Sequence, residues 1–350
     1  MPLNTNNRIF WAVKAVGVAA DGSTTFTPIK GLQTVGINTT FNLSQVFQVG
    51  QSSIYEQVED TPDVEVTLEK VLDGYPLIYH LATRQANSKT LIGRSNEKCS
   101  VAMSIFPDDL SSASGTPNTQ VYMSGLYVSN ISYNIALDDN STESVTLIGD
   151  HKVWTTGNFT FSGSLFNNQD VPLSLTSGTG GVQRREDLVW GAATNGTNTL
   201  LPGGTNGIPG IAANGTNSLR ANGRGYNAHI NSISVSADFG REALNELGTR
   251  APFFRFANFP IEVSTDIEVL TSDGDQISVT AGGVAGGGNN LDNERILVVM
   301  REGLKIDLGD KNKLQSVSYG GADAGGGNAT VTYSYVTYND MLVTHPQDPT

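Results

Sequence analysis

The stretch Pro62-Asp63-Val64-Glu65-Val66-Thr67-Leu68-Glu69 decides the fold class, because apolar and polar side chains alternate along it without interruption. A period of two places Val64, Val66 and Leu68 on one face of a β-strand and the two glutamates on the opposite face. A second stretch, Pro260-Ile261-Glu262-Val263-Ser264-Thr265-Asp266, follows a similar pattern in the last third of the chain. The sequence therefore predicts two acidic strands of related sequence.

The segments around these strands match as well, so the chain reads as a duplication. Four pairs of segments correspond: 37–43 with 230–235, 62–69 with 260–266, 126–133 with 314–319, and 145–147 with 331–333. Between the first two segments of each copy lies a stretch predicted to be helical, at 44–58 and at 238–248, and a short helix is expected at 76–82. Each copy is thus predicted to run hairpin, helix, acidic strand, hairpin. A duplicated β-module is typical of a building block rather than an enzyme.

Composition supports a mainly β fold with many turns. Only 16% of the residues are charged, and the 39 glycines supply the positive φ angles that tight turns need. We expect two tandem antiparallel β-sandwich or barrel modules, each with one flanking helix. The predicted boundaries are a first module at 1–156, a Gly-, Asn- and Thr-rich insertion or linker at 157–228, a second module at 229–344, and a frayed tail at 345–350.

The formal net charge of −13 argues against nucleic-acid binding, which requires clustered basic residues to neutralise phosphate. It permits a surface past which DNA slides, since like charges repel. Cys99 is the single cysteine, so an intramolecular disulfide is excluded and a buried structural thiol is expected. No apolar run approaches the length of a transmembrane helix, so membrane insertion is not expected.

The acidic strands supply the main candidate site. The strand period puts their carboxylates opposite the apolar face, where they would form a negatively charged wall facing a partner or a channel. An ordinary solvated sheet face is the alternative. The candidate residues are Glu65, Glu69, Glu262, Asp266 and Glu268.

Other chemistry finds little support in the sequence. Glycoside hydrolysis needs two positioned carboxyl groups, and no such pair stands out in an apolar setting. The four histidines fall in no ligand spacing, and the loop at 320–328 and the turn at 273–275 lack the remaining elements of a calcium site. We therefore expect no catalytic residues, no metal site and no cofactor.

Several segments together resemble the tail tube proteins of contractile-tailed bacteriophages. They are residues 7–13, 31–39, 62–74 and the Tyr-rich hairpin at 317–339. In that family each tube fold is two antiparallel sheets packed around a core, with one flanking helix. Subunits join sheets edge to edge into a ring whose lumen is a continuous β-barrel, and long hairpins grip the next ring. The resemblance implies a virion tail protein, assembled in the host cytoplasm, that conducts the genome and contacts the sheath and the baseplate or terminator proteins.

The acidic faces would then line the lumen, so that DNA passes without specific binding. The duplication departs from the family, whose members commonly carry one such fold. Three chains could form a pseudo-sixfold ring, as in hub proteins with two tube-like domains. Alternatively, six chains could place one copy at the lumen and the other outside it, or stack both copies axially. Six-fold symmetry is favoured because a stacked tube must match its sheath.

The predicted function is therefore a structural tail tube subunit that forms a homo-oligomeric ring. A baseplate hub or tube-initiator protein is the alternative within the same class. A carbohydrate-binding tail adhesin is the alternative from another class, with Trp154, Trp190 and Tyr226 as aromatic residues able to stack on sugars.

Overall fold

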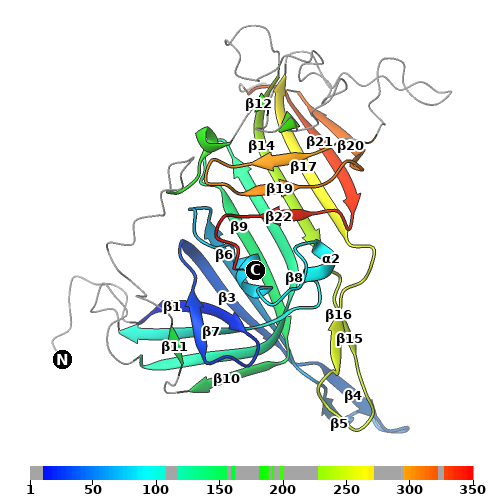
Figure 1. The fold of residues 1–350 in the computed structure, drawn as a ribbon. Helices are drawn as coiled ribbons and strands as arrows, with labels where there is room; N and C mark the ends of the chain where they lie inside the picture. Colours follow the sequence, from blue (N-terminus) through cyan, green and yellow to red (C-terminus); the bar gives the residue numbers. More distant parts are fainter. Residues whose placement is uncertain are drawn as a thin grey trace.

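A computed structural model describes residues 11–107, 117–155, 159–161, 181–188, 191–192, 198–199, 228–271, 293, 295–321 and 327–349. Strands dominate these residues, which confirms the mainly β architecture (Figure 1). The two helices are short: α1 spans Ile78–Ala82 and α2 spans Leu91–Arg94. The position of α1 agrees with the helix expected at 76–82.

The centre of the fold is an antiparallel ladder of eight strands in the order β3-β6-β9-β8-β14-β17-β21-β20. We call this ladder the main sheet. Its first four strands come from the first half of the chain and its last four from the second. The bounds are β3 Leu32–Thr40, β6 Asp63–Val71, β9 Thr142–Gly149, β8 Thr119–Ala136, β14 Ala228–Asp238, β17 Glu262–Thr271, β21 Thr330–Tyr338 and β20 Lys313–Gly320.

Strand β8 belongs to two ladders because it is 18 residues long. Its C-terminal part pairs with β9 and β14 in the main sheet, while its N-terminal part pairs with β7 and β10. The second ladder continues from β7 through β1 and β2 to β11. Its bounds are β1 Trp11–Ala20, β2 Thr25–Pro28, β7 Lys98–Pro107, β10 His151–Thr155 and β11 Thr160–Phe161.

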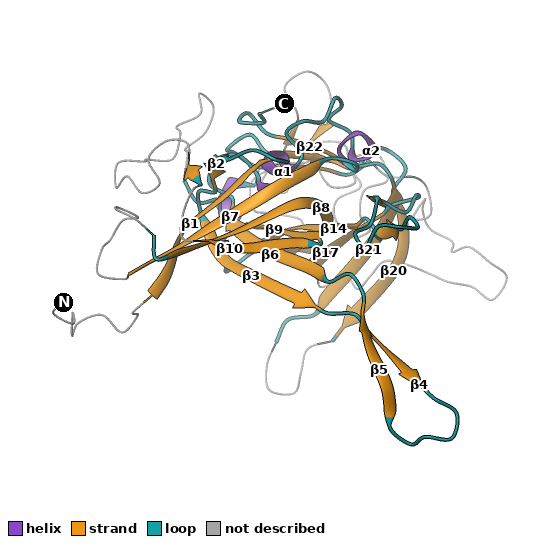
Figure 2. Cartoon of the chain, turned by 90° about the horizontal axis from the view of Figure 1, so that it is seen from below, coloured by secondary structure: helices purple, strands orange, loops and turns teal. Residues whose placement is uncertain are grey.

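One face of the main sheet is covered, and the described elements leave most of the other face uncovered. The covering elements are α1, α2, the β1–β7 ladder and a three-stranded sheet of β18 (Leu297–Val299), β19 (Lys305–Asp307) and β22 (Leu342–Thr344). Figure 2 shows α1, α2 and β22 together on one side of the main sheet. Val64, Val66 and Leu68 point into this layer and are at most 1% exposed, as their spacing predicts. A single hydrophobic cluster runs through both halves of the chain.

The two halves of the main sheet repeat each other strand for strand. In this repeat β3, β6, β9 and β8 correspond to β14, β17, β21 and β20. Irregularities in the ladder recur at matching places: a bulge at Leu32/Thr34 in β3 corresponds to one at Ile230/Ser232 in β14. A bulge at Val128/Asn130 in β8 likewise corresponds to one at Leu314/Ser316 in β20. Shared bulges fix the register of the two copies, because a bulge shifts every following side chain.

This register corrects three of the four predicted correspondences. Glu69 matches Glu268 and Val145 matches Tyr333, so the second and fourth pairs of segments are shifted by one and two residues. Ile37 lies opposite Val66, and Val235 lies opposite Thr265 at the equivalent point of the second copy, so Ile37 matches Val235 rather than Ile230. The correspondences of residues 131–133 with 317–319 agree with the observed bulges. The copies lie side by side in one sheet. The number of chains in a ring and their layout stay predictions.

The helices predicted at 44–58 and 238–248 are wrong. The first stretch is a hairpin of β4 (Leu43–Phe47) and β5 (Ile54–Glu59), in which Gly50 takes a φ of 87° that a helix cannot contain. The second is interrupted by Gly240, whose N–H binds the Asp238 carboxylate in a turn, and leads into a hairpin of β15 (Glu242–Leu244) and β16 (Phe254–Phe256). Local side chain-to-backbone bonding and positive φ angles override the helical spacing.

The boundaries at 156, 228 and 344 stay predictions, since the halves share a continuous sheet. Most of 157–228 lies outside the described residues. Within that segment the structure describes β11, a 3₁₀ turn at Arg185–Asp187, and the pair β12 (Gly191–Ala192) and β13 (Asn198–Thr199). The tail expected to fray is instead packed: His345 is 6% exposed and the Asp348 side chain 3% exposed.

Candidate functional site: the open face of the main sheet

The uncovered face of the main sheet, which we call the open face, is lined with small polar side chains. One row crosses six neighbouring strands as Thr34, Glu69, Ser144, Ser132, Ser236 and Ser264. The adjoining positions are mostly serine, threonine and asparagine, with Ile148 and Val336 among the exceptions. Directly paired residues point to the same side of a sheet, so this composition describes a continuous surface.

All five carboxylates predicted from the sequence lie on the open face. Glu65, Glu262 and Asp266 are exposed, whereas Glu69 and Glu268 are half-buried. The structure gathers them into two groups, one on β6 and one on β17. Three strands separate the groups, which corresponds to about 19 Å at the usual strand spacing.

Hydroxyl and amide groups on neighbouring strands hold several of these carboxylates. Thr34 Oγ1 donates to Glu69 Oε2 at 3.1 Å, and Ser334 Oγ donates to Asp266 Oδ1 at 2.6 Å. Glu268 accepts from Asn231 Nδ2 at 3.2 Å and from Ser232 Oγ at 3.4 Å. The donors are uncharged, so the negative charge of the face is not neutralised by them.

Asp63, at the start of β6, is a sixth carboxylate on this face, and Asp238, in the segment predicted to be helical, is a seventh. Asp238 is the last residue of β14 and pairs with Glu262 on one side and Asn130 on the other. The signal was present in the alternation Ser232, Ser234, Ser236, Asp238, which continues the strand period beyond the segment used for the match.

Basic residues are nearly absent from the open face. Lys313, at the start of β20, is the one lysine or arginine at the paired open-face positions of the described main sheet. Seven carboxylates lie on this face with one ammonium group and the guanidinium of Arg255, which pairs with Asp63, so the surface is negative. Such a surface repels polyanions and offers them no site of tight attachment.

The covered side of the sheet contains a network of buried charges. Glu143 is fully buried and accepts hydrogen bonds from the N–H groups of Ile78 and Tyr79 at 2.7 and 3.2 Å, and from the hydroxyl of Tyr133 at 3.1 Å. Lys70 Nζ pairs with Asp73 Oδ1 at 2.9 Å. Burial raises the pKa of Glu143.

Glu302 joins this network from the turn between β18 and β19, and so connects the second half of the chain to the first. Its Oε2 accepts from the N–H of Gly74 at 2.8 Å. Its Oε1 is buried with no hydrogen-bond partner among the described residues. Burial raises the pKa of Glu302 to about 8. The network is enclosed by the core cluster, which indicates a role in joining elements.

The C-terminal tail forms a second set of charged contacts. Asp348 Oδ2 lies 2.8 Å from Arg94 Nη2 and 3.3 Å from Lys89 Nζ, so the tail is tied to α2 and the segment before it. His80 Nε2 lies 3.2 Å from the carbonyl oxygen of Val343, to which it donates as the neutral ring. Burial lowers the pKa of His80 to about 3 and that of His345 to about 4, so both are uncharged at neutral pH.

Two hairpins extend from the same end of the main sheet. The longer one, β4–β5, projects away from the body and we call it the arm (Figure 2). Every residue of its strands is exposed, including the large apolar side chains Phe47 (63%) and Tyr55 (65%). The shorter hairpin β15–β16 touches the base of the arm, where Arg255 Nη2 lies 2.7 Å from Asp63 Oδ1.

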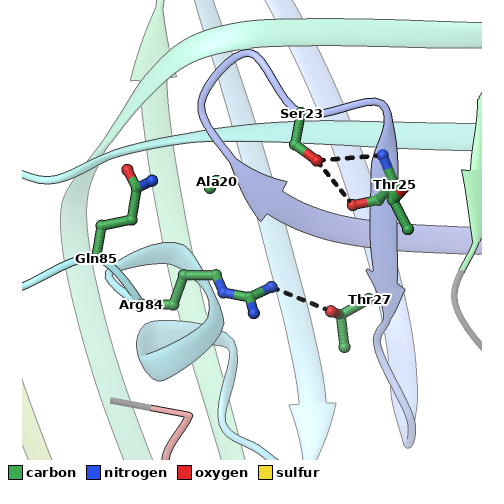
Figure 3. Close-up of a pocket in the computed structure, with 6 residues that line it drawn as sticks. All are labelled: Ala20, Ser23, Thr25, Thr27, Arg84 and Gln85. Carbon is green, nitrogen blue, oxygen red and sulfur yellow. Dashed lines mark hydrogen bonds between the residues drawn. The ribbon is translucent and has the colours of Figure 1, made fainter.

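Two pockets formed by described residues lack a pair of carboxyl or histidine groups suited to acid–base catalysis. One, of about 470 Å³, lies beside the β1–β2 turn, where Arg84 Nη1 donates to Thr27 Oγ1 at 3.4 Å (Figure 3). Its described lining contains no carboxylate and no histidine. A second of about 230 Å³ lies where β8 meets β14, and is lined mainly by apolar and small residues beside Arg185 and Glu186.

The remaining sequence candidates are partly outside the described residues. Trp154 is 53% exposed on β10. Trp190, Tyr226, the turn at 273–275 and most of the loop at 320–328 lie outside the described residues. Cys99 is free and buried, as expected. No cluster of three or more metal-ligating side chains occurs in the described part of the chain. The described helices are also too short to span a membrane.

Comparison with known proteins gives weak structural likenesses, two of which are as follows. No family model matches the sequence, and no curated protein matches it. The chain is similar to the PVC sheath–tube complex of an extracellular contractile injection system in its extended state, at 12% identity and a TM-score of 0.30, over 42% of this chain and 91% of that one. It is similar to the tube-terminating cap of the anti-feeding prophage at the same identity and TM-score, over 45% of this chain and 100% of that one. Likenesses of this size identify neither the fold nor the function.

Proposed function

We propose that the chain is a structural subunit of a tail particle, and that its main sheet forms part of the wall of a closed ring with the open face toward the lumen. The observation that carries this proposal is the open face itself. A surface with seven carboxylates and one lysine, lined otherwise mainly by small polar groups, suits a channel through which DNA or another polyanion must pass without binding.

The architecture fits a ring better than a free monomer. A sheet of eight twisted strands with two open edges is a liability for a lone chain, and closure into a barrel removes both edges. Because each chain supplies two copies of the repeat side by side, three chains supply six copies. We therefore propose three chains in a pseudo-sixfold ring, in place of the six chains favoured by the sequence.

The arm supports contacts along the axis of such an assembly. An isolated two-stranded hairpin is only marginally stable in water, and this one displays apolar side chains on both faces. We propose that it packs against a neighbouring ring or a neighbouring tail protein, such as the sheath, the baseplate or a terminator. In this role the protein has no catalytic activity and needs no cofactor, and its place is the virion tail.

Two members of this class remain, a repeating tube subunit and a baseplate hub or initiator. The presence of two copies in one chain favours the hub or initiator. Three such chains form one ring of six repeats, and a sixfold tube can then be built on that ring. Electron microscopy of the purified protein separates them: stacked hollow tubes indicate the tube subunit, and single rings indicate the hub. Isolated monomers at every concentration would contradict both.

The lumen assignment has its own test. The variant carries four substitutions on the open face: Glu65→Lys, Glu69→Lys, Glu262→Lys and Glu268→Lys. Assembly should persist, since these side chains lie outside the core, and the assembled rings should gain a salt-dependent affinity for DNA. A matched control places four lysines on exposed positions away from this face. Equal DNA affinity in the two variants would refute the lumen assignment.

A further inference from the structure

We infer that β20 of one copy pairs with β3 of the next copy, antiparallel and in the register that joins β8 to β14 inside each chain. This inference rests on the proposed ring and names the strands and residues that close it. The partner is a second copy of the same chain, joined head to tail.

The inner junction serves as the template. Strand β8 ends the first copy of the repeat and β14 begins the second, and seven successive residue pairs join them, from Ser232↔Ala136 to Asp238↔Asn130. Because β20 corresponds to β8 and β3 corresponds to β14, the same junction can form between the two open edges. The directions agree, since strands alternate along the sheet and the two edge strands run opposite to each other.

Neither edge is protected against such pairing. Natural edge strands are usually blunted by lysine, proline or an inward charge. Strand β3 runs Leu32-Gln33-Thr34-Val35-Gly36-Ile37-Asn38-Thr39-Thr40, with no charged residue and no proline, and β20 carries only Lys313 at its start. Among the described residues, β3 pairs with β6 alone and β20 pairs with β21 alone.

Side chains on the two edge strands are more exposed than their equivalents at the inner junction. Tyr133 in β8 is 1% exposed, whereas its equivalent Tyr319 in β20 is 52% exposed. Val235 in β14 is likewise 1% exposed, whereas its equivalent Ile37 in β3 is half-buried. Tyr319 and Ile37 are thus apolar side chains on the covered face of the two edge strands. Their counterparts in β8 and β14 are buried because a neighbouring strand is present there.

Because the bulges fix which residues of the two copies are equivalent, each residue pair of the β8–β14 junction predicts one pair between β20 and β3. Ser132 faces Ser236 in the template, so Ser318 should face Asn38 of the next copy. Tyr133 faces Val235, so Tyr319 should face Ile37 and cover it. The first pair lies on the open face and the second on the covered face, so the junction extends both the polar wall and the core.

Disulfide trapping tests this register. The double variant Asn38→Cys with Ser318→Cys should give covalent multimers on a non-reducing gel after mild oxidation, because directly opposed strand residues lie within disulfide reach. The native Cys99 is buried and does not compete. A mixture of the two single variants should give dimers, while each single variant alone should not, as a head-to-tail junction requires.

Two controls make the result specific. The template pair Ser132→Cys with Ser236→Cys should form its bond within one chain and yield no multimers. The off-register pair Thr34→Cys with Ser318→Cys places the thiols on the same face but about 14 Å further along the strand, beyond the reach of a disulfide. It should give at least tenfold less cross-linking than the predicted pair.

The outcomes separate this inference from the proposed function. Rings in micrographs together with no cross-link at 38 and 318 would overturn the β20–β3 register and leave the ring intact. Efficient cross-linking of the off-register pair would also overturn it. An intact template cross-link with neither rings nor multimers at any concentration would overturn both the register and the ring.

Discussion

Glu302→Gln should change how the stability of this protein depends on pH. The carboxyl group of Glu302 is 1% exposed, accepts one hydrogen bond from Gly74, and has one oxygen with no partner among the described residues. Burial raises its pKa to about 8 from an ordinary value of 4.5. At neutral pH the folded protein therefore keeps this acid protonated, whereas the unfolded chain ionises it.

The size of the effect follows from linkage. A carboxyl whose pKa is raised in the folded state stabilises the fold fully below pH 4.5, and this contribution is lost as pH rises through about 8. Each tenfold change in proton affinity is worth about 1.4 kcal/mol, so the wild type should lose up to about 5 kcal/mol from this group across that range. Glutamine cannot ionise, so the variant should not lose it.

Glutamine has a cost of its own. It preserves an acceptor for the Gly74 N–H but buries an amide with few partners, at about 1–3 kcal/mol. The variant should therefore be less stable than the wild type at pH 5 and more stable at pH 9. The free energy of unfolding from urea titrations at pH 5, 7 and 9 measures this crossing.

A matched control is Glu246→Gln, since Glu246 is exposed in the β15–β16 loop. Its curve should run parallel to that of the wild type at all three pH values. If Glu302→Gln also runs parallel to the wild type, the carboxyl is ionised in the fold and the reasoning fails.

Three further predictions concern the tail, the core and the arm. Asp348→Asn removes the charged partner of the buried Arg94 guanidinium and should destabilise the fold by about 3–5 kcal/mol in urea unfolding. Loss of the half-exposed Lys89 side chain should cost less than about 1 kcal/mol. Equal effects of the two changes would contradict the packed tail. Leu68→Ala, at a fully buried site, should lower the free energy of unfolding by about 2–5 kcal/mol, and a change below about 1 kcal/mol would contradict the assignment of the covered face. Phe47→Ser, at the exposed end of the arm, should leave stability within about 0.5 kcal/mol of wild type and reduce stacking of rings in micrographs; unchanged stacking would remove the arm from the axial contact.

Much of the open face was predictable from sequence, because it depends only on local period. The alternation at Val64, Glu65, Val66 and Thr67 fixes which side chains share a face, and burial follows that alternation in both acidic strands. The duplication was likewise visible, but its exact residue matches agree only for 131–133 with 317–319, because β-rich sequences offer several matches of similar quality.

The arm and the short hairpin were not predictable in the same way. Residues 44–58 and 238–248 have spacings compatible with a helix, and only the positive φ of Gly50 and the turn at Asp238 and Gly240 decide against it. The contacts of Glu302 with Gly74 and of Asp348 with Arg94 span 228 and 254 residues of sequence. Contacts at such separations depend on the packing of whole elements.

The sequence by itself determined that the chain is mainly β, that it is duplicated, and which carboxylates share a face, because these properties follow from short-range period and repetition. Only the tertiary structure decided that the two copies lie side by side in one sheet. That arrangement depends on backbone hydrogen bonds between β8 and β14, and backbone groups are chemically alike at every residue. Strand partners and edges are therefore set by the fold as a whole, and the choice between three chains and six depends on them.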